Sequence, residues 1–541
     1  MELLDTLNAE EKKSKEVATV STDEAFLEEA DKEEESLLKE QIPHVYQSSW
    51  FLGYFKPQPV VFQWILTIFA SIGGVLFGVD QSLISAVLLY MPQDLHLTSS
   101  QVSMVVGFPA LGALVGSAIV PACNLATGRK GSLIITTILY TVGAILEADS
   151  HGFGTMLAGR MVIGVALGLE GGTVPMYIAE CASRKKRGSL ISIYQFMLQV
   201  GILLGYVVDA MFVNVSGNWR FMLGSSLFFS TLLGVGTVIL PESPRWLVLT
   251  DRVTIAYSMW SKTKDLSQTD ERKEFFEMKR KVLREHEESK KRSVWLDLFR
   301  IRRNFRAVFL GVMLMIIQEF SGINAISYYM GTLLHRSGFS SLDSVYWSML
   351  PGFCGILGTL PPVLFMDRLG RRMMILAPMS VVIISLALCG FSFLISKENV
   401  SGRTALYMLG VCIYELFWSQ GLGPVPWVIL GEAFPAYLRN HGMAVGDFVT
   451  FVGNFITTYW FSDMAAAMTE TGVFAGFFGG ITFLGLLYCL LLMPETKDKT
   501  LEQLDEVFEM PTRELVIKNI ESSKTAMNDL LHFRFGKALG W

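Results

Sequence analysis

The chain has 541 residues, of which 51% are apolar and 18% are charged, and its mean hydropathy is +0.41. This balance excludes an ordinary soluble domain, in which about a quarter of the residues are charged. Long apolar runs recur along the chain, so the composition predicts a membrane protein with many spans rather than a single anchor.

Residues 1–59 alternate Glu and Lys and contain few aromatic residues. This pattern predicts an acidic cytoplasmic tail that is disordered or loosely helical; a regulatory role for its charges is the alternative to a simple solvated surface. The first apolar run begins only after this tail. We therefore expect it to stay as a membrane anchor and not to be cleaved as a signal peptide.

Twelve apolar runs follow, each close to the length of about 20 residues with which a helix crosses a bilayer. They predict an all-α membrane protein with twelve transmembrane helices in two six-helix bundles, residues 60–243 and 307–494. The first six runs cover residues 61–90, 102–125, 133–148, 155–179, 190–212 and 219–240. The second six cover residues 308–334, 345–366, 374–395, 405–431, 443–461 and 473–493.

Two polar segments lie outside the predicted bundles. Residues 244–306 form a linker with clusters of Lys and Arg, which amphipathic helices on an anionic inner leaflet would explain. Binding of nucleic acid is the alternative for these clusters, and the predicted topology disfavours it. Residues 495–541 predict a cytoplasmic C-terminal tail that places Leu501 and Phe508 on one helical face.

The loops predict the orientation of the helices. The short loops after the second, fourth, eighth and tenth runs hold most of the loop arginines and lysines, so both termini and the linker are expected in the cytoplasm. Asn214-Val215-Ser216 and Asn399-Val400-Ser401 are sequons in loops that this topology places outside, and we expect glycosylation at Asn214 and Asn399. We favour the plasma membrane over the vacuole as the location.

The two halves repeat three features at offsets of 242 to 253 residues. This parallel duplication predicts pseudo-symmetric bundles that rock about a site at their interface. The matched features are a Gly-Arg-basic turn (128–130 and 370–372), a Glu followed by an Arg (180 and 187, 432 and 439) and a Pro-Glu-Ser/Thr motif (241–243 and 494–496).

The six cysteines lie in apolar runs or at their edges without close spacing, and the seven histidines form no His-x-x-x-His pattern. We therefore expect the cysteines to act as small apolar residues rather than disulfides. Nothing in this pattern predicts a metal site or a cofactor.

The stretch from Gln318 to Tyr329 places hydrogen-bonding side chains inside an apolar run. Unpaired amides cost about 2 to 7 kcal/mol in hydrocarbon, so these side chains should face protein or a wet cavity. Gly322 would let the helix bend there and expose backbone groups. We interpret the stretch as one wall of a solute-binding site; polar contacts between helices are the alternative.

Charged residues at membrane depth are functional candidates by default. Asp80 and Arg160 fall at similar depths, so they can pair, and a motion that separates them would switch Asp80 between its ionised and protonated forms. That is the chemistry of a proton symporter; a permanent structural salt bridge is the alternative. The full set at this depth is Asp80, Arg160, Glu170, Asp209, Glu319, Glu415 and Asp447.

Several motifs together resemble the sugar porter family within the major facilitator superfamily. They are Pro-Met-Tyr-Ile-Ala-Glu at 175–180, Pro-Glu-Ser-Pro-Arg-Trp at 241–246, Asp-Arg-Leu-Gly-Arg-Arg at 367–372, Pro-Glu-Thr at 494–496 and the stretch that begins at Gln318. The resemblance covers nearly all of residues 60–508 and implies the major facilitator fold. The acidic tail and the long central linker are similar to those of fungal members.

The resemblance implies a set of residues that contact the substrate. Gln195, Gln318, Asn324 and Asn454 match the family's sugar-contacting amides, which can both donate and accept hydrogen bonds. We expect them to share a water-filled pocket at mid-bilayer. Trp427 matches the tryptophan that packs against a sugar's C–H face, although simple packing is the alternative for this residue.

The resemblance also implies residues for proton coupling, for the outer gate and for helix bending. Asp80 and Arg160 match the pair linked to proton coupling in the family, and Tyr328 and Tyr329 resemble its outer gate. Glycine and proline residues at positions 421, 423, 424 and 426 would supply the break that lets the tenth helix bend.

At the cytoplasmic side, arginines near helix ends can meet acids and hold this side shut. The positive-inside topology alone is the alternative explanation for these arginines. The residues assigned to this gate are Glu180, Arg187, Asp367, Arg371, Glu432 and Arg439, with Arg129 and Arg372 as further partners. Leu125 replaces the acid of the first-half motif, so we expect a weaker latch in this half and a resting state that opens inward.

The substrate site departs from the family at Glu319, where a second glutamine is usual. A protonated Glu319 could still donate a hydrogen bond. An ionised Glu319 can only accept, which favours a polyol with several donating hydroxyls, a cationic solute or a second proton site.

These patterns predict a proton-coupled symporter of a monosaccharide or polyol that works by alternating access and is not an enzyme. Its expected partners are the sugar or polyol, the proton and the lipid bilayer, with no nucleic acid. A transport-poor nutrient sensor and an uncoupled sugar facilitator are the alternatives.

Overall fold

A computed structural model describes residues 35–36, 59–181, 187–263, 269–291, 294–434, 436–497 and 506–531. Nearly all of the predicted acidic tail and parts of the C-terminal tail therefore lie outside the described residues. The chain divides into two compact units. One comprises residues 1–63 and 243–288, and the other comprises residues 64–242 and 289–541.

The smaller unit contains most of the predicted linker. Its helices are α10 (Pro244–Leu249), α11 (Val253–Thr263) and most of α12 (Thr269–Lys291). Tyr257 is fully buried in its small apolar core, with its ring 5.1 Å from that of Phe275, and its hydroxyl donates a 2.8 Å hydrogen bond to Glu35. The helices expected in this segment are thus present, while their place on a membrane surface stays a prediction.

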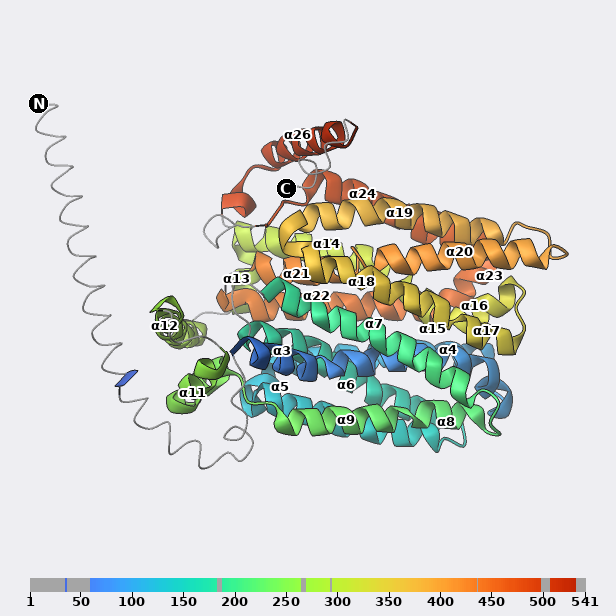
Figure 1. Cartoon of the computed structure of the whole chain (residues 1–541), viewed down its shortest axis with the longest axis horizontal. Coiled ribbons are helices and arrows are strands. Elements are labelled where there is room, and N and C mark those ends of the chain that lie inside the picture. Colours follow the sequence, from blue (N-terminus) through green and yellow to red (C-terminus); the bar gives the residue numbers. More distant parts are fainter. Residues whose placement is uncertain are drawn as a thin grey trace, which may run out of the picture. The chain divides into compact units, whose positions relative to one another are not determined.

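The larger unit holds both predicted bundles. In Figure 1 the blue to green helices α4–α9 and the yellow to red helices α14–α24 run side by side as two groups. The first bundle comprises α3 (Pro59–Ala70), α4 (Ile72–Asp94), α5 (Ser99–Ala148), α6 (Phe153–Cys181), α7 (Arg187–Phe212), α8 (Asn218–Gly224) and α9 (Ser226–Ile239).

The second bundle begins after α13 (Val294–Arg300) and is followed by α26 (Thr512–Leu531). Several of its spans are built from two or three consecutive helices. They are α14 (Arg302–Glu319), α15 (Ile323–Tyr328), α16 (Met330–Ser337), α17 (Ser341–Trp347), α18 (Met349–Leu369), α19 (Arg371–Ser392), α20 (Val400–Trp418), α21 (Pro424–Ala433), α22 (Ala436–Tyr459), α23 (Phe461–Thr471), the π-helix η2 (Gly472–Phe478) and α24 (Gly479–Leu492).

Within the described ranges, nine helical spans are long and apolar enough to cross a membrane. The number is below the twelve predicted runs because α5 contains two of them, the tenth is interrupted between Trp418 and Pro424, and α22 contains polar residues such as Asp447 and Asn454 that lower its hydropathy. Each of the twelve predicted runs is helical over most of its length, and the runs form two bundles of six.

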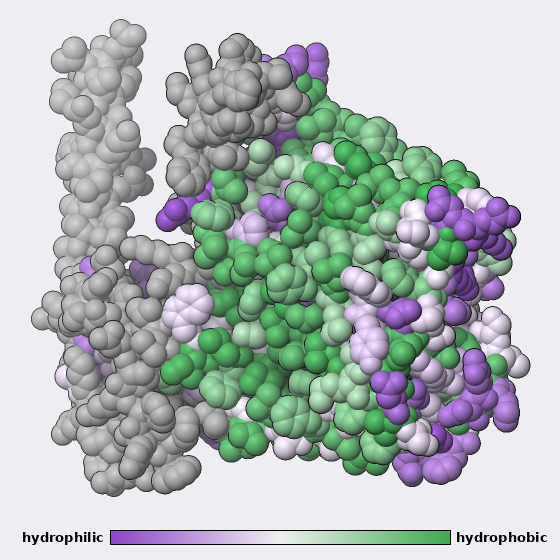
Figure 2. Space-filling model, turned by 45° about the vertical axis from the view of Figure 1, so that its right-hand side comes forward, coloured by the Kyte–Doolittle hydropathy of each residue, from purple (hydrophilic) through white to green (hydrophobic). Residues whose placement is uncertain are grey.

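The outside of the larger unit is apolar where lipid would surround it. Figure 2 shows a broad hydrophobic surface over the bundles, with hydrophilic residues gathered toward one end. Large apolar side chains on different helices are more than 60% exposed, among them Phe228, Leu364 and Leu484. A soluble monomer seldom exposes so continuous an apolar surface, and a bilayer accounts for it.

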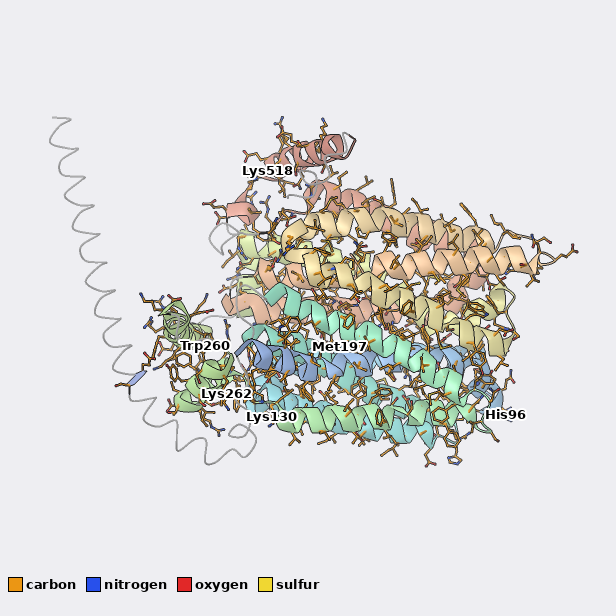
Figure 3. All side chains as sticks on the ribbon, viewed as in Figure 1. His96, Lys130, Met197, Trp260, Lys262 and Lys518 are labelled. Carbon is orange, nitrogen blue, oxygen red and sulfur yellow. The ribbon has the colours of Figure 1, made fainter. Side chains whose placement is uncertain are left out.

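The two ends of the bundles are distinct. We call the end that carries Arg129, Lys130 and Arg371 the motif end, and the opposite end, which carries His96, the distal end; Figure 3 labels Lys130 and His96 at these two ends. At the motif end, α5 turns sharply at Gly128, whose φ of +79° is rare for residues with a side chain. A Cβ atom there would lie 2.3 Å from Glu242 Oε2.

The second bundle repeats this turn. Gly370, between α18 and α19, has a φ of +84°, and a Cβ atom there would lie 2.7 Å from Glu495 Oε2. In each half a glycine thus lets a carboxylate approach the turn closely. The duplication read from the sequence is confirmed in backbone conformation as well as in residue type.

Candidate functional site

The seventh span is broken at the predicted place. α14 ends at Glu319, α15 begins at Ile323, and Gly322 between them has a φ of +96°. The break frees the carbonyl of Ser321, which accepts a 3.1 Å hydrogen bond from the hydroxyl of Tyr414 on α20. Gly322 therefore bends this helix, as the sequence predicted.

The tenth span is also broken, between Trp418 and Pro424, as the glycine and proline residues predicted. Gln318 Nε2 donates hydrogen bonds to two carbonyls in this break, Leu422 at 2.9 Å and Gly423 at 3.0 Å. The amide of Gln318 thus joins one broken helix to the other. Its Oε1 atom is buried and accepts no hydrogen bond from any described residue.

A chain of polar side chains leads from this break into the first bundle. Asn324 on α15 donates through its Nδ2 to Glu319. Gln81 on α4 donates a 3.0 Å hydrogen bond to Asn324 Oδ1. Because Gln81 belongs to the first bundle and Asn324 to the second, this hydrogen bond crosses the interface between them.

Asn454 belongs to the same region, since its side chain lies close to the hydroxyl of Tyr328 on α15. We call Gln81, Gln318, Glu319, Asn324 and Asn454 the polar cluster. Its members are only 3 to 6% exposed. The cluster is therefore nearly closed to solvent in this conformation, unlike the open water-filled pocket that we expected.

Two further predicted substrate residues lie outside the polar cluster. Gln195 on α7 is buried beside the break of the tenth helix, since a Cβ atom on Gly423 would lie 3.3 Å from its Nε2. Trp427 on α21 is half-buried and packs against the apolar core. No hydrogen bond within the described part of the chain connects Trp427 to the cluster.

Beside the polar cluster lies the predicted ion pair. Arg160 Nη1 on α6 is 2.7 Å from Asp80 Oδ1 on α4, and both side chains are buried. Arg160 Nε donates a 3.1 Å hydrogen bond to the carbonyl of Val105, which orients the guanidinium. The pairing expected from their similar depths is confirmed as a contact, and its part in coupling stays a prediction.

Asp80 and Gln81 are consecutive residues of α4 with different partners. Asp80 pairs with Arg160 inside the first bundle, whereas Gln81 reaches Asn324 in the second. One turn of helix thus connects a titratable ion pair to the polar cluster. Gln81 was not among the predicted site residues; its position next to a buried acid was the available signal.

The other acids at membrane depth are also buried. Glu170 accepts a 3.1 Å hydrogen bond from Tyr194, and Glu415 accepts a 3.3 Å hydrogen bond from Gln199 across the bundle interface. Asp209 and Asp447 are 1% and 2% exposed. A further buried acid, Glu147, lies near Arg160 and was not predicted.

Toward the distal end, the two tyrosines predicted as the outer gate lie near a contact between the bundles. Tyr329 donates to the carbonyl of Thr458, and its ring lies 4.9 Å from that of Phe461. From the first bundle, Ser85 Oγ accepts a 2.8 Å hydrogen bond from the Gly331 amide. The gating role of Tyr328 and Tyr329 stays a prediction.

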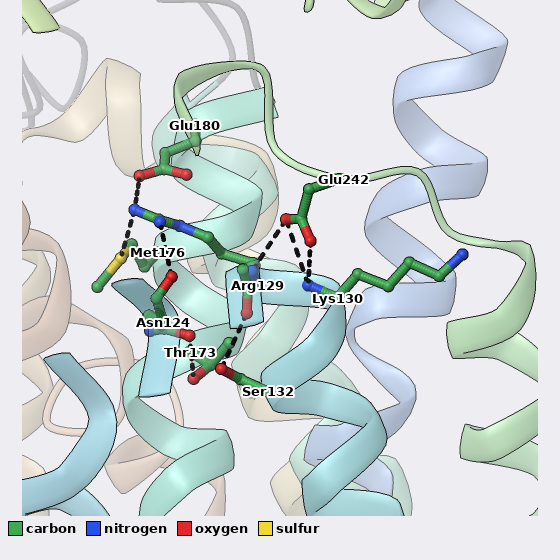
Figure 4. A network of polar contacts seen from close by, with 9 residues as sticks. Asn124, Arg129, Lys130, Ser132, Thr173, Met176, Glu180 and Glu242 are labelled. Carbon is green, nitrogen blue, oxygen red and sulfur yellow. Dashed lines mark hydrogen bonds and ion pairs between the residues drawn. The ribbon is translucent and has the colours of Figure 1, made fainter. Parts of the chain in front are cut away.

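At the motif end, the predicted first-half network is present (Figure 4). Arg129 Nη2 lies 2.7 Å from Glu180 Oε1. The backbone amides of Arg129 and Lys130 donate to the carboxylate of Glu242, at 2.9 Å in the case of Arg129. Glu242 therefore fixes the turn, while Glu180 fixes the side chain that follows it.

The second half has the same arrangement. Arg371 Nη2 lies 2.7 Å from Glu432 Oε1, and the Arg371 amide donates a 3.0 Å hydrogen bond to Glu495. The Arg–Glu pair is thus equally short in both halves. Although Leu125 replaces an acid, this replacement does not lengthen the first-half pair.

The side chain of Arg372 has different partners from those predicted. The side chain of Arg372 was expected to meet an acid, yet it donates to the carbonyls of Leu490 and Asn519. Asn519 lies on α26 and donates in turn to the carbonyls of Leu491 and Met493. This arginine therefore connects the second bundle to the C-terminal helix. The side chains of Arg187, Asp367 and Arg439 lie outside the described residues.

The two sequon asparagines lie on loops at the distal end. Asn214 is exposed and donates a 3.1 Å hydrogen bond to the hydroxyl of Tyr346. Asn399 is exposed and its Oδ1 accepts a hydrogen bond from the Gly402 amide at the start of α20. Their glycosylation stays a prediction. Among the described residues no group of His, Cys, Asp and Glu could hold a metal ion, and all six cysteines are free thiols.

The chain is similar to known transporters along most of its length. A family model described as "Sugar (and other) transporter" matches residues 66–508. The chain is 42% identical over 488 residues to the myo-inositol transporter FST1 of Gibberella moniliformis, covering 88% of this chain and 85% of that protein. It is 30% identical over 439 residues to the galactose-proton symporter of Escherichia coli, covering 81% and 92%.

The fold is similar to a solved structure of the proton:xylose symporter XylE of Escherichia coli bound to 6-bromo-6-deoxy-D-glucose. The TM-score is 0.72 at 24% sequence identity, and the match covers 82% of this chain and 99% of XylE.

Proposed function

Because this chain belongs to the sugar transporter family of the major facilitator superfamily, we propose that it moves a polyol or a monosaccharide across a membrane together with a proton. One observation carries the proposal. The ion pair of Asp80 and the hydrogen bond of Gln81 to Asn324 arise from adjacent residues of one helix. A change in the protonation of Asp80 can therefore reach the polar cluster directly.

The polar cluster has the chemistry of a site for hydroxyl groups. Amides of Gln81, Gln318, Asn324 and Asn454 both donate and accept, and the carbonyls freed by the two helix breaks accept further hydrogen bonds. A solute that enters the cluster would replace the internal hydrogen bonds with its own. Broken helices at the interface of two bundles are the usual place for such a site in secondary transporters.

Glu319 supports a polyol as the substrate. Its carboxylate accepts from Asn324 and, when ionised, has acceptor capacity left for the hydroxyls of a solute. A polyol offers a donating hydroxyl on every carbon. The similarity to a myo-inositol transporter points in the same direction, so inositol-type cyclic polyols are the first substrates to test.

In the proposed cycle, the two bundles rock about the polar cluster. The matched Arg–Glu pairs at the motif end would stabilise one conformation, and the contact of Ser85 with Gly331, close to Tyr328 and Tyr329, would stabilise the other. We place the motif end and both termini in the cytoplasm because the loop arginines and lysines gather there. The plasma membrane is the proposed location.

The test is uptake into proteoliposomes that contain the purified full-length protein. Radiolabelled myo-inositol, xylose and glucose are compared with and without an imposed pH gradient. Accumulation of one of them above equilibrium only with the gradient is the expected result. Uptake to equilibrium regardless of the gradient would indicate a facilitator, and no uptake of any of these solutes would favour a sensor.

A further inference from the structure

A second buried carboxylate shares the arginine of the proposed coupling pair. Glu147, in the last turn of α5, has its Oε1 atom 3.5 Å from Arg160 Nη1, the same nitrogen that lies 2.7 Å from Asp80 Oδ1. Glu147 and Arg160 are both 0% exposed. One guanidinium therefore lies between two acids that come from different helices.

Close packing fixes the position of Glu147. A Cβ atom on Gly159, the residue before Arg160, would lie 2.7 Å from Glu147 Cγ, so α5 and α6 approach closely at this point. The second oxygen of Glu147, the second oxygen of Asp80 and Arg160 Nη2 have no hydrogen-bond partner among the described residues. Each acid thus has a free oxygen on which to hold a proton.

The charges of this group constrain its protonation. With both acids ionised, Asp80, Glu147 and Arg160 sum to −1, and with one proton bound they are neutral. A buried group that excludes water favours the neutral form, because an uncompensated buried charge costs several kcal/mol. Among the described residues, Tyr140 and Tyr328 are the other titratable side chains that interact with this group, and they are neutral near pH 7.

We propose that Glu147 is a positioning residue for proton coupling, which holds Arg160 when Asp80 takes up the transported proton. In the unloaded state the guanidinium is shared by two carboxylates. A proton from solution then binds the Asp80 carboxylate, its ion pair with Arg160 is lost, and Arg160 stays paired with the ionised Glu147. Release of the proton from Asp80 on the other side of the membrane restores the shared arrangement.

The consequence is a link between the proton and closure of the site. The loaded centre is neutral and the unloaded centre carries −1, so binding of the proton lowers the cost of keeping the centre sealed from water. Without Glu147, the neutral state is the unloaded one, because Asp80 and Arg160 then balance each other. Protonation of Asp80 would leave Arg160 as an unpaired positive charge. Loss of Glu147 should therefore make Asp80 harder to protonate.

The inference rests on the proposed symport, and its test is the pH profile of uptake by Glu147→Gln in proteoliposomes. Half-maximal uptake should move to more acidic medium by about one pH unit or more, while exchange of labelled for unlabelled solute at equal pH is retained. Asp149→Asn, which removes an exposed acid two residues away, is the matched control and should leave the profile unchanged.

The outcomes separate the two proposals. A wild-type protein without gradient-driven uptake contradicts the proposed symport itself. If wild-type uptake depends on pH and Glu147→Gln has the same pH profile, only the role of Glu147 is overturned. The same conclusion follows if Glu147→Gln loses uptake and exchange equally, without a shift in the pH of half-maximal uptake. If Glu147→Gln does not fold, the pH profile of Glu147→Asp is measured instead. Its shorter carboxylate side chain should shift the profile in the same direction by a smaller amount, and an unchanged profile overturns the role of Glu147.

Discussion

Gln81 donates a 3.0 Å hydrogen bond to Asn324 across the interface between the bundles, and the two residues are 243 positions apart in the sequence. This hydrogen bond is a direct polar link between the helix that bears Asp80 and the broken helix that bears the polar cluster. It is therefore a contact that a bound solute or a moving bundle should disturb.

Replacing Gln81 by alanine should weaken solute binding without removing the ion pair of Asp80 with Arg160. The change leaves the buried Asn324 Oδ1 without its donor, and an unsatisfied buried polar group costs about 1 to 3 kcal/mol. We expect the KM for uptake to rise by about 5- to 100-fold, while accumulation still depends on the pH gradient. An unchanged KM would exclude Gln81 from the site.

Asp80→Asn should abolish accumulation and spare exchange. The asparagine is close in size to the aspartate but cannot bind a transported proton, so it separates coupling from the structural role of the pair. We expect uptake driven by a pH gradient to fall to the equilibrium level. Counterflow exchange should stay within about threefold of wild type. Wild-type accumulation in this variant would make the ion pair merely structural.

Glu319→Gln should shift substrate preference away from polyols. The glutamine can still accept from Asn324 but loses the charge and acceptor capacity of the carboxylate. Competition of unlabelled myo-inositol and glucose for uptake of a common tracer measures the preference. A hydrogen bond to a charged group contributes about 1.5 to 3 kcal/mol, so we expect the ratio of their inhibition constants to change about tenfold or more. An unchanged ratio would remove Glu319 from substrate recognition.

Alanine at either Gly128 or Gly370 should destabilise the protein. Each position has a φ near +80°, and each new Cβ would lie within 3 Å of a carboxylate oxygen that binds the turn. We expect the apparent melting temperature to fall by about 2 to 4 °C or more. Gly480→Ala on α24 is the control, because its Cβ would meet nothing within 4 Å. Equal melting temperatures would show that the turns relax without cost.

Leu125→Asp should stabilise conformations that are closed at the motif end. Leu125 is 59% exposed at the position where the second half carries Asp367, and an acid there would add a further charge to the arginine network of the first half. Single cysteines placed on α6 and α22 near this end should react more slowly with a polar thiol reagent in the Leu125→Asp background. Unchanged labelling rates would contradict the predicted weak latch.

The sequence predicted the features that depend on local conformation or on repetition. The break at Gly322 follows from a glycine inside a polar stretch of an apolar run, and the two Arg–Glu pairs each join a Gly-Arg turn to a glutamate, two features that recur in both halves. The twelve runs were visible because a bilayer requires continuous apolar helices. Each of these signals is contained in a short window of sequence.

Other features depend on packing between distant helices and left no such signal. Asp80 and Gln81 are adjacent, yet Asp80 contacts the first bundle and Gln81 contacts the second. The hydrophobic periodicity of the helix does not specify these partners. Glu147 lies at the end of an apolar run, close to Asp149, so in the sequence it looks like a charged loop residue. In the structure α6 packs against it and buries it. Arg372 binds backbone carbonyls of α24 and α26, and carbonyls are common to every residue type.

Both helix breaks beside the polar cluster belong to the second bundle, whereas Asp80 and Arg160 belong to continuous helices of the first. The unbroken helices of the first bundle thus hold the ion pair, whereas the second bundle, which contains both breaks, supplies most of the polar cluster. Mutations that change the transported solute can then accumulate in the second bundle while the ion pair of Asp80 with Arg160 is kept. Relatives that carry different solutes with the same ion should accordingly differ more in the second bundle than around the arginine.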